Sequence, residues 1–97
     1  MRNIRLLIAF DGTGYCGWQR QQHGATIQGE IENRLRRMTG ESVPLHGAGR
    51  TDAGVHADGM VANFHTGGTI PCSAFFLGLN AMLPPAIRIL HVDEVRP

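Results

Sequence analysis

The residues of this sequence best suited to chemistry lie in the glycine-rich stretch GAGRTDAGVHA at positions 47–57. Glycines at this density let a backbone come close to a ligand, so such a loop can direct Arg50 and Asp52 into a pocket. In an extended segment, residues two apart point to the same side, where the guanidinium would keep the carboxylate charged. The alternative is a tight turn held by a local salt bridge between Arg50 and Asp52. Under the first interpretation the stretch offers one charged carboxylate as a reactive group.

Other kinds of site find less support in the spacing of residues. A dinucleotide-binding fingerprint would need a third glycine where Asp52 stands, and a helix where the strand-like run 59–65 follows. A P-loop would need a lysine, and the sequence has none. His46, His56 and His65, together with Asp52, match no standard metal-site spacing, so we expect no metal. A lone carboxylate would not serve ordinary glycoside hydrolysis, which generally pairs two acids.

A second candidate site is the stretch 15–23, which combines two aromatic residues with amides and a base. This mixture suits stacking on nucleic-acid bases and hydrogen bonding to them, with Trp18, Gln19 and Arg20 at its centre. The alternative for a lone tryptophan is that Trp18 completes the hydrophobic core.

The elements that would position these residues follow from the period of the apolar residues. Alternation predicts strands near 3–10, 43–47, 58–65 and 87–95, the second of them an edge strand because it contains Pro44. Spacings of four, four and three predict a helix near 27–39, and a second helix is predicted near 72–83. Thr26 is a good N-cap and Gly40 a good stop for the first helix. We expect Glu30–Arg34 and Glu32–Arg36 to pair on its outer face.

The resulting order βαββαβ is that of the ferredoxin-like fold, an α+β architecture with a four-stranded antiparallel sheet and two helices on one face. Ninety-seven residues make a single domain, 1–97, with one modest core. Because many unrelated functions use this fold, it favours none of them.

Composition adds little about partners. Nine basic residues against eight acidic ones give a net charge of +1, which makes no electrostatic case for a nucleic-acid or membrane partner. Cys16 and Cys72 match no zinc spacing, and no signal peptide or long apolar span is evident. These features favour a soluble protein of the cytoplasm with two free thiols.

Several motifs together strongly resemble the TruA family of tRNA pseudouridine synthases. They are GRTDAGVH at 49–56, FDG at 10–12 followed by GWQRQ at 17–21, and the pairs LN at 79–80 and LP at 83–84. The resemblance covers nearly the whole chain. It implies that Asp52 is the catalytic residue and that Arg50 contacts both Asp52 and the RNA. It also implies RNA contacts for the group Trp18, Gln19, Arg20 and His56, and no metal or organic cofactor.

What the resemblance implies about the reaction is specific. Family members isomerise uridine to pseudouridine at tRNA positions 38 to 40 of the anticodon stem-loop, and they act as homodimers. They consist of two ferredoxin-like halves, and the second half carries a tyrosine that stacks on the target base. This chain therefore resembles the N-terminal half only, and we expect it to be inactive alone. The alternative is a small module that binds RNA or an anion without chemistry.

Overall fold

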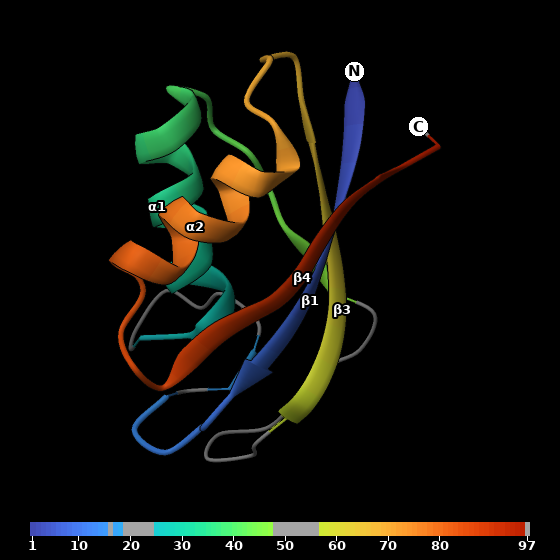
Figure 1. Ribbon diagram of the computed structural model, residues 1–97. Helices are drawn as coiled ribbons and strands as arrows, with labels where there is room; N and C mark the ends of the chain where they lie inside the picture. Colours follow the sequence, from blue (N-terminus) through green and yellow to red (C-terminus); the bar gives the residue numbers. More distant parts are fainter. Residues whose placement is uncertain (16, 19–24, 48–56, 97) are drawn as a thin grey trace.

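The computed structural model describes residues 1–15, 17–18, 25–47 and 57–96. Its elements follow the predicted order, which confirms the ferredoxin-like architecture: β1 (Arg2–Phe10), α1 (Ile27–Thr39), β2 (His46–Gly47), β3 (Ala57–Thr66), α2 (Cys72–Met82) and β4 (Ile87–Val95). The strands form one antiparallel sheet in the order β2-β3-β1-β4. Both helices lie on the same face of this sheet, and none of the described residues forms a helix on the other face (Figure 1).

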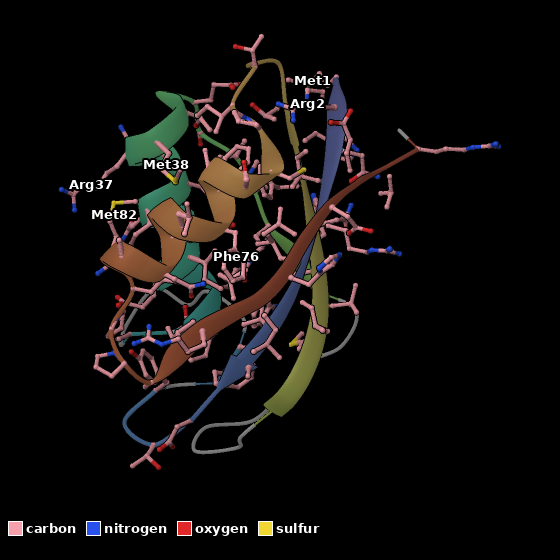
Figure 2. All side chains as sticks on the ribbon, in the orientation of Figure 1. Met1, Arg2, Arg37, Met38, Phe76 and Met82 are labelled. Carbon is pink, nitrogen blue, oxygen red and sulfur yellow. The ribbon has the colours of Figure 1, made fainter. Side chains whose placement is uncertain are left out.

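The core lies between the sheet and the two helices. Ile4, Leu6 and Ile8 alternate along β1 and are fully buried, because every second residue of the strand faces the helices. Phe64 of β3 meets Phe75 of α2 edge to face, with ring centroids 5.2 Å apart. Figure 2 shows the side chains that fill the space between the two layers.

Both predicted caps of α1 are confirmed. The Thr26 hydroxyl accepts a hydrogen bond from the Gly29 N–H, and Gly40 ends the helix in the left-handed conformation with φ 72°. The predicted pair of Glu30 and Arg34 is also present, at 3.4 Å. Neither helix in the described part of the chain is long and apolar enough to cross a membrane.

Two expectations were wrong. The strand predicted near 43–47 is limited to His46–Gly47, because Pro44 has no N–H and the backbone of Leu45 is hydrogen-bonded to side chains of α1 instead of a strand. Glu32 was expected on the outer face of α1, but it is only 7% exposed. Its carboxylate accepts the Leu45 N–H at 2.8 Å, which places it on the inner side of the helix.

Candidate functional site

Most of the predicted site residues lie outside the described part of the chain. This holds for Arg50, Asp52 and His56 of the glycine-rich stretch and for Gln19 and Arg20 of the aromatic stretch. The catalytic and RNA-binding roles assigned to them therefore stay predictions. What the structure does describe is the framework from which both stretches leave.

The two ends of the segment 48–56 are fixed by strand pairing. Gly47, the last residue of β2, lies opposite Ala62 in the middle of β3. Ala57, the first residue of β3, lies opposite Phe10 at the end of β1. Ala57 and Ala62 are five residues apart along the strand, or about 17 Å. The segment that carries Arg50 and Asp52 thus joins β2 to the far end of its neighbour, at one edge of the sheet.

Trp18 lies beside the starting point of that segment. Its side chain is 3% exposed and belongs to the hydrophobic core, and its ring centroid lies 6.1 Å from that of Phe10. A Cβ placed on Gly47 would lie 2.5 Å from Trp18 Nε1, so the indole packs directly against the β2 backbone. This burial favours the alternative in which Trp18 completes the core. An RNA contact by Trp18 stays a prediction, and the buried ring instead supports the position of Gly47.

Residues that sequence reasoning missed hold the segment before β2. Gln28 Nε2 donates to the Leu45 carbonyl at 2.8 Å, and the Glu32 carboxylate accepts the Leu45 N–H at 2.8 Å. The sequence does contain a signal for them. Pro44 prevents a regular strand, so the polar groups of the neighbouring backbone must find partners elsewhere, and a helix packed alongside can supply them.

Tyr15, at the start of the aromatic stretch, is partly buried and packs against the core. Burial raises the pKa of its phenol, the Glu30 carboxylate raises this pKa further, and Arg34 opposes the rise. The phenol is therefore a neutral hydrogen-bonding group at physiological pH.

The face of the sheet without helices is polar in its central row. Arg5 of β1 lies opposite Asn63 of β3 and Asp93 of β4, and Asn63 lies opposite His46. Arg5 donates to both carboxylate oxygens of Asp93, at 3.0 and 2.6 Å, and these hydrogen bonds hold the pKa of Asp93 below its usual value. No three His, Cys, Asp or Glu side chains gather as a metal site within the ranges described.

The chain is similar to known proteins over almost its entire length. Residues 6–97 match a family model described as tRNA pseudouridine synthase. A tRNA pseudouridine synthase A 1 from Desulfotalea psychrophila is 65% identical over 95 residues, which cover 98% of this chain and 38% of the relative. Proteins called tRNA pseudouridine synthase A from Geotalea daltonii and Clostridium botulinum are 58% and 52% identical, with 98% of this chain and 39% of each relative covered.

The chain thus spans less than two-fifths of the length of these relatives. The family match nevertheless includes β1 from Leu6 onward, both helices, the glycine-rich stretch and the remaining strands. The chain belongs to the tRNA pseudouridine synthase family.

Proposed function

We propose that this chain is the N-terminal part of a tRNA pseudouridine synthase and contributes the catalytic aspartate, Asp52. The observation that carries the proposal is the family match over residues 6–97, which includes the whole stretch 47–57 between β2 and β3. The names and high identity of the relatives support a tRNA substrate. Uridines at positions 38 to 40 of the anticodon stem-loop are the proposed targets.

The reaction needs only one carboxylate. The bond between C1′ of the ribose and N1 of uracil breaks, the base turns, and C1′ joins C5, while C5 loses a proton and N1 gains one. In this proposal Asp52 attacks C1′ or removes the C2′ proton, and no outside acceptor is required. Because a uridine inside a stem must first be flipped out, Arg50 steadies the displaced nucleotide or the backbone beside it.

The proposed RNA contacts divide between the two loops. Gln19, Arg20 and His56 are proposed to touch the RNA, together with Arg50. Trp18 is buried, and its carbonyl accepts the Gln28 N–H at the N-terminus of α1, so we assign it the task of holding its loop in place.

Two further proposals concern the whole protein. We propose that the chain is one half of the catalytic unit, since it spans 38% of the relative from Desulfotalea psychrophila, and that the cleft requires the rest. We also propose that the protein works as a homodimer in the cytoplasm. The exposed apolar side chains of Phe76, Leu77 and Leu90, between α2 and β4, support a covered surface in the assembled protein.

The test is tritium release from tRNA labelled at C5 of uridine. The full-length protein should release tritium, its Asp52→Asn variant should release none, and this variant should still bind tRNA because only a charge is removed. The 97-residue chain alone should show no turnover, because half of the cleft is missing. Release by the Asp52→Asn variant would show that the catalytic residue is assigned wrongly, and tRNA binding without release by the full-length protein would favour a binding module.

A further inference from the structure

Two side chains of α1 replace a missing strand partner for Leu45. Gln28 Nε2 donates to the Leu45 carbonyl at 2.8 Å and to Glu32 Oε2 at 3.2 Å, and Glu32 Oε2 also accepts the Leu45 N–H at 2.8 Å. An amide nitrogen has two hydrogens to donate, and this arrangement uses both of them. The result is a closed ring of hydrogen bonds, which we call the Leu45 clamp, between two residues of the helix and one backbone unit.

The clamp lies in a dry environment. Leu45 is 1% exposed and Glu32 is 7% exposed, so water cannot easily replace a lost partner. A backbone group left without a partner in such a place is strongly destabilising. The clamp therefore fixes the backbone of Leu45 firmly, one residue before β2 begins.

Gln28 also contacts the backbone directly before the stretch 19–24. Its backbone N–H donates to the Trp18 carbonyl at 2.9 Å, and the neighbouring Ile27 N–H donates to Gly17 at 3.2 Å. The indole of Trp18 in turn lies against Gly47. Gln28 thus holds the residues from which the stretches 19–24 and 48–56 both depart.

We propose that Gln28 is a positioning residue for pseudouridine formation, which acts with Glu32 to set where the loop bearing Arg50 and Asp52 leaves the sheet. The inference rests on the proposed function. Its physical basis is that catalysis needs reacting groups placed within a fraction of an ångström, and an error of about 1 Å can cost on the order of a hundredfold in rate. Among the described residues, His46 and Gly47 of β2 pair with β3, and the clamp holds the backbone of Leu45 directly before them.

The critical experiment compares Gln28→Met with Thr66→Val in the full-length protein. Methionine keeps the length and helix propensity of glutamine but cannot donate to Leu45 or Glu32. Thr66 is a matched control, because it is 1% exposed, makes two hydrogen bonds, to Glu41 and Gly68, and lies at the opposite end of β3 from Ala57. Each variant loses the two part-buried hydrogen bonds named here, so losses of thermal stability of the same order are expected.

Two measurements separate positioning from general stability. The single-turnover rate of isomerisation, at saturating enzyme and a temperature where each variant is folded, should fall about tenfold or more in Gln28→Met with tRNA affinity little changed. Hydrogen exchange of the peptide backbone over 45–56 should become faster in the same variant. Thr66→Val should keep both the rate and the exchange pattern of the wild type. A Gln28→Met rate within twofold of wild type, or an equal loss in Thr66→Val, would overturn the inference.

Two more variants keep the test decisive. Glu32→Gln retains an oxygen that can accept from both N–H groups, so this variant should keep most of the wild-type rate. A loss as large as that of Gln28→Met would contradict the hydrogen-bond account. If Gln28→Met does not fold, Gln28→Asn, which is too short to reach both partners, should show the same loss. If the wild type itself does not isomerise uridine, the proposed function fails. Unchanged hydrogen exchange over 45–56 in Gln28→Met would then independently overturn the positioning role.

Discussion

The contact of Trp18 with the backbone of Gly47 predicts how much Gly47→Ala changes the free energy of unfolding. A Cβ on Gly47 would lie 2.5 Å from Trp18 Nε1, 2.7 Å from Trp18 Cε2 and 2.6 Å from Met60 Cε. Real Cβ atoms do not approach other atoms so closely, so a neighbour must move. The methyl group of Met60 is the end of a flexible chain and can shift. The indole of Trp18 is rigid, 3% exposed and packed on Phe10, so its displacement decides the cost.

The magnitude follows from two opposing effects. Gly47 does not have a positive φ, so alanine is free of backbone strain there and should gain about 0.4 to 1 kcal/mol by restricting the unfolded chain. Forcing an extra carbon into a packed core typically costs about 1 to 3 kcal/mol. We therefore expect Gly47→Ala to lower the free energy of unfolding by about 1 to 2 kcal/mol.

The assay is urea unfolding of the 97-residue chain, followed by the fluorescence of its single tryptophan. With a urea dependence of about 1 to 3 kcal/mol per molar, the midpoint should fall by about 0.3 to 2 M. Gly59→Ala is the matched control. Its new Cβ would meet only Leu7 Cδ1, at an ordinary 3.6 Å, and it should be neutral or slightly stabilising. A Gly47→Ala chain as stable as the Gly59→Ala chain would refute the reasoning. So would a loss of unfolding free energy that disappears when Met60→Ala is also present, because Trp18 would still be in place in that double variant.

Two further predictions concern a titration and an assembly. The 97-residue chain has one tyrosine, Tyr15, and its phenolate absorbance should appear at a higher pH in the folded chain than in urea, with Glu30→Gln lowering the folded midpoint. The raised pKa means that the neutral phenol stabilises the folded chain. Because the unfolded phenol ionises first, at about pH 10, this stabilisation is complete below that pH and is lost as the pH rises through the folded pKa. Equal midpoints in the folded and unfolded chains would contradict the assigned environment. For the proposed homodimer, sedimentation of the full-length protein should show a concentration-dependent dimer that Leu77→Glu weakens, and a monomer at every concentration would count against it.

Local signals predicted most of the fold because they agree with the tertiary packing. The alternation along β1 and the caps at Thr26 and Gly40 depend on residues within a few positions of each other, and the structure confirms them. The residue at which β2 begins could not be predicted in this way. Leu45 has the apolar character of a strand residue and is buried like one, but its hydrogen bonds go to Gln28 and Glu32 on another element.

The roles predicted for Arg50 and Asp52 stay predictions, because both residues lie outside the described part of the chain, and the contacts that hold the adjacent backbone were not predicted. The motif around Asp52 identifies the family from sequence, because glycines, an arginine and a carboxylate at these positions are read without any knowledge of the fold. The prediction that Glu32 is exposed to solvent depended on its charge alone, since a glutamate in an i,i+4 pair is usually exposed. That assignment failed because a buried carboxylate is acceptable where a backbone N–H satisfies it, and here the donor comes from Leu45.

The backbone of Leu45 is held by side chains of α1, and there is a physical reason for this arrangement. Pro44 has no N–H for a ladder, and the described part of β2 begins only at His46, so the backbone of Leu45 between them depends on partners outside the sheet. Helix α1 has an N-cap, a left-handed C-cap and an internal ion pair, so the positions from which its side chains project are well defined. Attaching Leu45 to that helix transfers its rigidity to the start of the segment 48–56. In the first turn of the same helix, the Gln28 N–H donates to the Trp18 carbonyl. One helix can therefore fix the starting points of the segments 19–24 and 48–56 relative to each other.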